Sequence, residues 1–316
     1  MNVQQEKWTG IEIGGTKLQV VVSNADGSIL RHLRFPIDVA SGAAGIQAQL
    51  QNAITEIDTN GITAIGVGFG GPVDWKTGCI QTSHQVEGWT QFPLKDWLQE
   101  RTGAPVFIDN DANVAALAEA VHGAGRNFNP VFYMTIGSGI GGGLILDKKI
   151  YHGATPGEVE IGHIRLGKDG TTLESQCSGW AVNKKVRDAI NQHPTSLLAQ
   201  LHKNHSGPEA MLLQPALEKK DPVAKEIINV LGDDLAFSLS HVVHLFHPQT
   251  IIIGGGLSLL GAHLLQPVQE RLPHYVMNAF LPAPLIQTAA LGENVVPVGA
   301  LELAKQAFRE TQNRIV

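Results

Sequence analysis

Hydrophobic and polar positions divide the chain into short apolar runs of strand length and longer stretches with helical periodicity. In the first half, "GIQAQLQNAITEI" repeats apolar residues at helical spacing, whereas "ITAIGVGFG" and "PVFID" are continuous apolar runs. In the second half, "DPVAKEIINVLGDDLAFSLSHVVHLF" has helical periodicity, and "QTIIIGGG" begins as a buried strand. Strands that alternate with helices in this way predict an α/β fold.

Two segments follow the same plan. "TGIEIGGTKLQVVVSNADGSILRHLRF" and "VFYMTIGSGIGGGLILDKKIYHG" are each predicted to form a strand, a glycine turn, a second strand, a polar turn and a third strand. Helices and further strands follow each of them. We therefore predict a duplicated α/β architecture with a cleft between two domains, residues 1–112 and 113–297. The helical stretch 298–316 is predicted to pack back on the first domain.

Length, charge and cysteine content exclude several classes of protein. A chain of 316 residues exceeds the size of one comfortable core, which agrees with two domains. The net charge of −6 argues against a nucleic-acid-binding surface. Two cysteines, Cys79 and Cys177, cannot build a disulfide framework, which fits a reducing cytosol. The polar start "MNVQQEKWTG" resembles no signal peptide, and no apolar run is long enough to span a membrane. We expect a cytoplasmic protein that binds neither nucleic acid nor membrane.

Glycine-rich turns are the first candidates for ligand binding. "GVGFGG" and "GSGIGG" match G-x-G-x-x-G, but that motif needs a helix directly after it, and here a proline and an apolar strand follow. The turns Gly14-Gly15-Thr16 and Gly137-Ser138-Gly139 expose backbone N–H groups that can approach phosphate oxygens. Either turn alone is best interpreted as a simple β-turn, but two in matching positions favour a bound nucleotide. A third run, Gly254, Gly255 and Gly256, suits a flat adenosine face.

A cluster of carboxylate and amide side chains marks the junction of a strand and a helix in "VFIDNDANVAALAEAV". It contains Asp109, Asn110, Asp111 and Asn113. Such residues are common helix N-caps, because they accept bonds from the first N–H groups of a helix. The same residues could instead form a binding and catalytic cluster, and the residue pattern leaves both interpretations open.

Taken in order along the chain, the motifs resemble the ROK family of sugar kinases, within the actin-like ATPase superfamily. They are "IEIGGTK", "GFGGPVDWKTG", "EGW", "IDNDANVAALAE", "TIGSGIGGG", "EIGH", "LESQCSG" and "IIIGGGLS". The resemblance implies two actin-like (ribonuclease H-like) domains, with ATP and sugar meeting in the interdomain cleft. It also implies ATP-dependent phosphorylation of a hexose, and glucose, converted to glucose 6-phosphate, is the substrate expected first. The family resemblance further implies a homodimer.

The resemblance assigns roles around the sugar. Asp111 would be the general base for the attacking hydroxyl, and Asn110 would bond sugar hydroxyls. Asp109 and Asn113 would keep structural roles, capping the helix and satisfying backbone groups. The other sugar contacts carried over from the family are the backbone N–H of Gly71 and the side chains of Glu160, His163 and Glu174.

The resemblance also assigns the nucleotide contacts. They are Gly14, Gly15, Thr16 and Lys17 on one side and Thr135, Gly137, Ser138 and Gly139 on the other, with Gly254, Gly255 and Gly256 at the adenosine. For Lys17, a surface charge is an equally good interpretation.

Metal use is expected to be limited to Mg²⁺. It bridges phosphate oxygens and keeps several waters. Glu12, where the family has Asp, would hold it through water. Many family members carry a structural zinc bound by the "GH" histidine and three cysteines. Here "IRLGKDGTTLESQCSG" follows His163, and the one nearby thiol, Cys177, comes after Glu174. We therefore predict no structural zinc, and a bond from the second ring nitrogen of His163 to a carbonyl or carboxylate.

Other functions stay open at this point. Fructose, mannose or N-acetylmannosamine could be the acceptor, and polyphosphate could be the donor. A non-catalytic sugar sensor is a further alternative, but the retention of Asp111 and of both phosphate turns speaks against it. A family repressor would carry a helix-turn-helix before the first strand, and here that strand is expected to start near Trp8.

Overall fold

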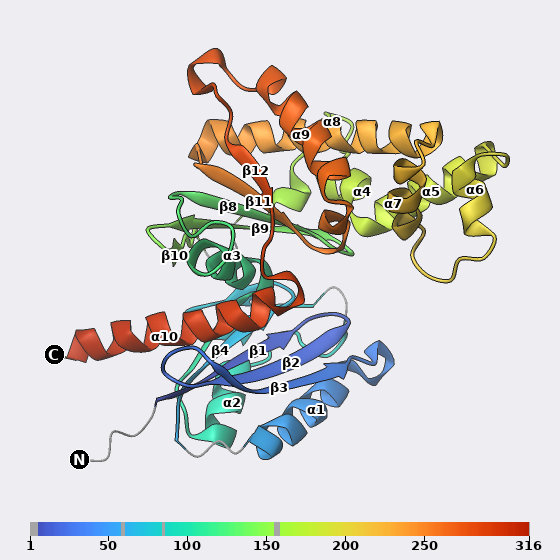
Figure 1. The fold of residues 1–316 in the computed structure, drawn as a ribbon. Helices are drawn as coiled ribbons and strands as arrows, with labels where there is room; N and C mark the ends of the chain where they lie inside the picture. Colours follow the sequence, from blue (N-terminus) through green and yellow to red (C-terminus); the bar gives the residue numbers. More distant parts are fainter. Residues whose placement is uncertain (1–5, 58–60, 84–85, 155–158, 316) are drawn as a thin grey trace. The chain divides into compact units, whose positions relative to one another are not determined.

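The computed structural model describes residues 6–57, 61–83, 86–154 and 159–315 (Figure 1). Its internal contacts divide the chain into two compact units. Unit 1 comprises Met1–His122, Lys148–Glu158 and Glu293–Val316, and unit 2 comprises Gly123–Asp147 and Val159–Gly292. The chain therefore crosses between the units more than once, and its last helix is counted with the first unit.

The two five-stranded sheets share one topology. The first has the order β3-β2-β1-β4-β7 and the second the order β10-β9-β8-β11-β12. In each, two strands form an antiparallel hairpin around a glycine turn, and further strands run parallel to the first strand of that hairpin. The predicted duplication is confirmed. The β1–β2 turn and the β8–β9 turn consequently occupy equivalent positions in the two sheets.

The elements of the first sheet and its helices have the following bounds. The strands are β1 Lys7–Ile13, β2 Lys17–Ser23, β3 Ile29–Pro36, β4 Ile62–Phe69 and β7 Val106–Asn110, with a small hairpin of β5 Val73–Asp74 and β6 Cys79–Ile80. The helices are α1 Gly42–Ile57, α2 Leu94–Thr102, α3 Asp111–Val121 and α10 Val295–Ile315.

The second sheet and the remaining helices are as follows. The strands are β8 Val131–Ile136, β9 Ile140–Leu146, β10 Lys149–Ile150, β11 Thr250–Gly254 and β12 Leu285–Thr288. The helices are α4 Leu173–Cys177, α5 Gly179–Gln192, α6 Leu197–His202, α7 Leu213–Glu218, α8 Pro222–Phe246 and α9 Ala262–Tyr275. Short 3₁₀ turns are η1 Val39–Ser41, η2 Ile161–His163, η3 Glu209–Leu212, η4 Gly256–Leu260, η5 Asn278–Phe280 and η6 Gly292–Asn294.

Both faces of the inner strands β1, β2 and β4 are covered, which explains their nearly continuous burial, whereas the edge strand β3 is largely exposed. Val20 and Val22 of β2 belong to the core beneath α1 and α2, whereas Val21 belongs to a smaller cluster with Leu301 and Ala304 of α10. Figure 1 shows α10 across one face of this sheet, with α1 and α2 on the other.

Glycines let α10 approach the sheet closely. Gly10 of β1 and Gly66 of β4 are paired across the two strands. A Cβ added to Gly66 would lie 1.9 Å from the carbonyl oxygen of Ala300, and one added to Gly10 would lie 2.5 Å from that of Pro297. A side chain cannot occupy this space, so the backbones of helix and strand meet directly.

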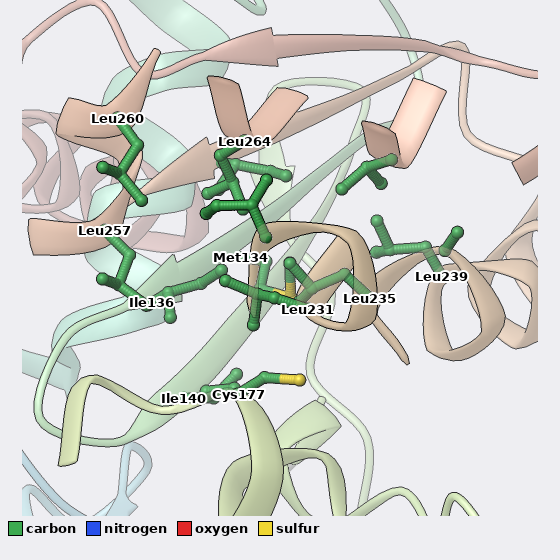
Figure 2. Packing of buried hydrophobic residues seen from close by; sticks show 14 of the residues in the cluster. Met134, Ile136, Ile140, Cys177, Leu231, Leu235, Leu239, Leu257, Leu260 and Leu264 are labelled. Atoms are coloured by element: carbon green, nitrogen blue, oxygen red, sulfur yellow. The ribbon is translucent and has the colours of Figure 1, made fainter. Parts of the chain in front are cut away.

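Unit 2 has its own core between the second sheet and its helices. Figure 2 shows Met134 of β8 next to Leu231 and Leu235 of α8, all fully buried. Asp221 caps α8, because its Oδ1 accepts from the N–H groups of Val223 and Ala224 at 2.8 and 2.9 Å. Within the described residues, no helix is both long and apolar enough to cross a membrane.

Candidate active site

The β7–α3 junction carries the predicted polar cluster, and the structure shows which residue caps the helix. Asn110 is the N-cap of α3, and its Oδ1 accepts from the N–H of Ala112 at 2.9 Å. Asp109 Oδ1 instead accepts from the N–H of Asn110 at 2.8 Å and from Nδ2 of Asn113 at 2.9 Å. The expected capping role of Asp109 and Asn113 is therefore wrong, whereas Asp109 does satisfy a backbone group, the N–H of Asn110. Asp109 and Asn113 form a hydrogen-bonded pair with each other instead. Asp111 is the first residue of α3.

Asn110 also fixes Gly71. Its Nδ2 donates to the carbonyl oxygen of Gly71 at 3.1 Å, while the N–H of Gly71 donates to the carbonyl oxygen of Phe69 at 2.9 Å. The N–H that was expected to face the sugar is thus used within the protein in this structure. The contact that Gly71 makes toward the cluster is through its carbonyl oxygen.

Asp111 and the Gly14–Thr16 turn both lie close to Gly70. A Cβ placed on Gly70 would be 3.3 Å from Asp111 Oδ2 and 3.4 Å from the Cα of Gly14. The N–H of Gly70 donates to the carbonyl oxygen of Ile13 at 2.8 Å, which ties β4 to the start of the turn. Unit 1 therefore brings a carboxylate and a glycine turn into one small region.

Glu12 lies buried beside the same turn. Its Oε1 is 3.3 Å from Lys17 Nζ, and its Oε2 accepts from Gln19 Nε2 at 2.5 Å. Burial raises the pKa of Glu12, an effect that the nearby Lys17 ammonium opposes. Lys17 is consequently engaged with Glu12 rather than being a simple surface charge.

Glu174 contacts the Gly137–Gly139 turn. The N–H of Gly137 donates to the carbonyl oxygen of Gly139 at 2.9 Å, and the N–H of Ile140 donates to Glu174 Oε2 at 2.7 Å. A Cβ on Gly139 would lie 2.6 Å from the same Oε2. Glu174 thus contacts the turn directly, so a sugar contact would have to share this carboxylate with the turn.

Glu160 is the N-cap of the short turn η2 and His163 is its last residue, and both are exposed. The backbone N–H of His163 donates to the carbonyl oxygen of Glu160 at 3.0 Å. A Cβ on Gly162, between them, would lie 3.4 Å from Glu174 Oε2, so η2 and α4 are neighbours. Within the described part of the chain, the His163 ring makes no hydrogen bond, and the expected bond to a carbonyl or carboxylate is not formed.

An apolar cavity of about 440 Å³ opens beside the Gly137–Gly139 turn. Gly137 and Ser138 of the turn line it together with Gly256. Trp180 and Met211 complete its wall with side chains that are 68% and 64% exposed. Its remaining lining residues are Ile136, Gly179, Asn183, Pro208, Ala210, Gln214, Leu257, Leu259 and Leu260.

The three glycines after β11 have different roles. A Cβ on Gly254 would lie 2.2 Å from Tyr133 Oη, and one on Gly255 would lie 2.6 Å from the backbone of Ile136, so both allow β11 to pack against β8. Only Gly256 faces open space and lines the cavity. The adenosine role predicted for all three therefore has support at Gly256 alone.

His152 is a neighbour of the cluster that sequence reasoning missed. Its Nε2 lies 2.6 Å from Asp109 Oδ2, and its ring stacks on Trp75 at 4.1 Å between centroids. A histidine in the segment "YHG" carries no motif of its own, and its partner Asp109 is 43 positions away in sequence. Only the fold brings them together.

We expect the purified protein to contain no stoichiometric zinc. Burial raises the pKa of the Cys177 thiol to about 12, so zinc, which binds the thiolate, would have to displace a proton held more tightly than on a free cysteine. Among the described residues, no group of three His, Cys, Asp or Glu side chains could hold a metal ion. Elemental analysis of untagged protein checks this prediction. It would be contradicted by one zinc per chain if a chelator removed both the zinc and the activity, and if Mg²⁺ alone did not restore that activity.

Comparison with known proteins places this arrangement in a family. The chain matches the ROK family profile over residues 8–307. It is 29% identical to a glucokinase of Halalkalibacterium halodurans, over 95% of this chain and 96% of that one. It is 30% identical to a glucokinase of Streptomyces coelicolor, over 94% and 97% of the two chains. The crystal structure of a ROK family glucokinase from Streptomyces griseus, in complex with glucose and AMPPNP, superposes with a TM-score of 0.82 at 30% identity, covering 95% of this chain and 99% of that one.

These matches extend over nearly the whole length of both partners in each pair, and the duplicated sheets agree with the fold of the solved relatives. The chain therefore belongs to the ROK family, as a sugar kinase with two actin-like α/β domains.

Proposed function

We propose that this kinase transfers the γ-phosphoryl group of ATP to a hexose, with glucose as the preferred acceptor and glucose 6-phosphate as the product. The observation that carries the proposal is the position of Asp111, whose carboxylate lies beside Gly70, as does Gly14 of the Gly14–Thr16 turn. A proton acceptor next to a phosphate-binding turn is the arrangement that phosphoryl transfer to a hydroxyl requires. The glucokinases among the relatives support glucose as the acceptor.

In this mechanism Asp111 accepts the proton of the attacking hydroxyl. Its position at the first residue of α3 favours the ionised carboxylate, because the helix N-terminus carries partial positive charge. Phosphoryl transfer depends on positioning and charge neutralisation more than on a strong base, so a carboxylate suffices. Asn110 holds the backbone at this point and has a second Nδ2 hydrogen to offer a sugar hydroxyl.

A cavity in unit 2 favours ATP over polyphosphate as the phosphoryl donor. A turn with the topology of the Gly14–Thr16 turn, Gly137–Gly139, borders an apolar cavity of about 440 Å³. Polyphosphate has no apolar part that would fill such a cavity, whereas a purine base would stack against Trp180 and Met211. We assign Thr135, Gly137, Ser138 and Gly139 to the phosphates and the cavity to adenosine.

The residues beside the first turn fit a Mg²⁺ ion that comes with ATP. Oxygen ligands suit Mg²⁺, and Glu12 supplies a buried carboxylate 3.8 Å from the position of a Cβ on Gly14. Both Glu12 oxygens already bond Lys17 or Gln19, so Glu12 would hold the ion through water. When bound, the ion would neutralise charge on the phosphate oxygens.

We assign candidate sugar contacts in each unit separately, by the family resemblance. Asn110 and Asp111 come from unit 1, and Glu160, His163 and Glu174 come from the η2–α4 region of unit 2. Carboxylates that accept from sugar hydroxyls discriminate strongly, because a substrate that lacks a hydroxyl leaves them unpaired. Fructose, mannose and N-acetylmannosamine share several hydroxyl groups with glucose and remain the alternative acceptors.

A coupled ADP-release assay over glucose, fructose, mannose and N-acetylmannosamine tests the proposal. We expect the highest kcat/KM with glucose and ATP in the presence of Mg²⁺. A parallel assay replaces ATP with polyphosphate and measures the sugar phosphate directly. Binding of a sugar without turnover with either donor would instead favour a non-catalytic sensor.

Filling the cavity should weaken the use of ATP. A side chain at Gly256 points into open space, so Gly256→Phe would place a ring where we assign the adenosine. We expect the KM for ATP to rise at least about tenfold, which corresponds to about 1.4 kcal/mol of lost binding. Steady-state kinetics measures this, and Val230→Phe, at an exposed position of α8, is the matched control. An unchanged KM for ATP would place the adenosine elsewhere.

A further inference from the structure

A histidine–aspartate pair joins three segments of unit 1 next to Asp111. His152, just after β10, places its Nε2 2.6 Å from Oδ2 of Asp109, at the end of β7. The imidazole also stacks on Trp75 with an interplanar angle of 15°. Asp109 is 3% exposed, and the His152 side chain is 19% exposed. The bond is therefore largely shielded from water, and the proposed mechanism assigns it no role.

The Asp109 carboxylate holds the residues on both sides of Asp111. Its Oδ1 accepts from the backbone N–H of Asn110 and from Nδ2 of Asn113, and its Oδ2 contacts His152. An ionised carboxylate only accepts hydrogen bonds, so the His152 Nε2 carries the hydrogen. Without that donor, Oδ2 would be a buried acceptor with no partner there, which is costly enough to rotate the carboxylate away from Asn110 and Asn113.

The stacking partner of His152 belongs to the segment that contacts Asn110. Trp75 lies in the hairpin between β5 and β6, and Gly71, just before this hairpin, accepts from Asn110 Nδ2. His152 therefore touches both the hairpin and the β7–α3 junction. Its ring and its N–H make separate contacts, so the two can be removed separately by mutation.

We propose that His152 is a positioning residue for Asp111: its Nε2–H orients the Asp109 carboxylate, and that carboxylate fixes Asn110 and Asn113 on either side of the base. The imidazole does not touch the reacting atoms. The kinetic part of this proposal rests on the proposed function, whereas the structural part, the ordering of the β7–α3 junction, does not.

Two substitutions separate the donor from the ring. His152→Phe keeps a ring that can stack on Trp75 but removes the donor to Asp109. His152→Gln removes the ring but can place an amide N–H close to the position of Nε2. If the donor is what matters, the Phe variant is impaired and the Gln variant is largely rescued. If packing of the ring on Trp75 is what matters, the order is reversed.

Hydrogen–deuterium exchange measures the order of the β7–α3 junction in the two variants, and steady-state kinetics measures their activity. We expect His152→Phe to speed exchange in peptides covering residues 107–114, and to lower kcat by about 10–100-fold through misplacement of the base. The KM for the sugar should change by much less than kcat. His152→Gln should keep the protection and most of the kcat. His122→Phe is the matched control, because it removes another histidine–carboxylate contact of unit 1, with Glu302.

Each outcome decides the proposal. Wild-type exchange in His152→Phe, or equal defects in the Phe and Gln variants with thermal unfolding unchanged, would overturn it. If the wild-type protein phosphorylates none of the sugars, the proposed function fails, and the exchange experiment still decides whether His152 orders the junction. Faster exchange in His122→Phe over the same peptides would show that the effect is not specific to His152 and would also contradict the proposal.

Discussion

Asp111→Asn is expected to reduce kcat by about 10²–10⁴-fold, the usual contribution of a general base. The asparagine keeps an acceptor oxygen for the sugar hydroxyl but cannot take its proton. Sugar affinity should therefore stay within about tenfold of wild type, or about 1.4 kcal/mol. Steady-state kinetics and calorimetric titration of the sugar measure the two quantities. Asp188→Asn, at a half-buried aspartate of α5 paired with Lys184, is the matched control.

Stability measurements on Asp111→Asn show whether a loss of activity comes from the lost base or from unfolding. Asn110, not Asp111, provides the cap of α3, so the substitution leaves the capping bond intact. The loss of a negative charge at the helix N-terminus is worth about 0.3–1 kcal/mol, which is too little to unfold the protein. A variant with normal kcat would show that Asp111 is not the base.

Gly66→Ala is expected to have the largest effect on stability. A Cβ at this position would lie 1.9 Å from the Ala300 carbonyl oxygen and 2.8 Å from its carbon, so α10 would have to move off the sheet. Overpacking of this kind typically costs about 1–3 kcal/mol and sometimes more, and backbone contacts this short belong at the upper end. For a unit of this size that corresponds to a fall in Tm of roughly 6–12 °C.

Thermal unfolding followed by circular dichroism tests this prediction. Gly256→Ala is the control, because a Cβ there meets no atom within 4 Å. We expect its Tm to equal that of the wild type. If the two variants unfolded at the same temperature, the close contact between α10 and β4 would be refuted.

Periodicity was sufficient to predict the main elements. "GIQAQLQNAITEI" lies within α1, and the long helical pattern of the second half matches α8, Pro222–Phe246, with Asp221 as its cap. The two glycine-turn hairpins form as predicted, and both sheets have the same strand order. Burial on one or both faces imposes these patterns on each segment separately, so each segment can be interpreted without knowledge of the others.

Contacts between distant segments could not be predicted. The type of residue at the β7–α3 junction indicated a cap, but all four polar residues suited it, and the choice of Asn110 depends on its backbone conformation. The bond between His152 and Asp109 depends on where β10 ends. The cavity beside Gly256 depends on Trp180 and Met211, which belong to other elements and look like ordinary apolar residues in sequence. These features follow from tertiary packing.

The most direct test of the account is ³¹P NMR of wild-type protein with glucose, ATP and Mg²⁺. We predict that the γ-phosphorus signal of ATP is replaced by a sugar phosphate monoester at the 6-position, in equal amount to the ADP formed, and that Asp111→Asn forms almost none in the same time. Release of inorganic phosphate in place of the sugar phosphate, or no turnover with any hexose tested, would contradict the account.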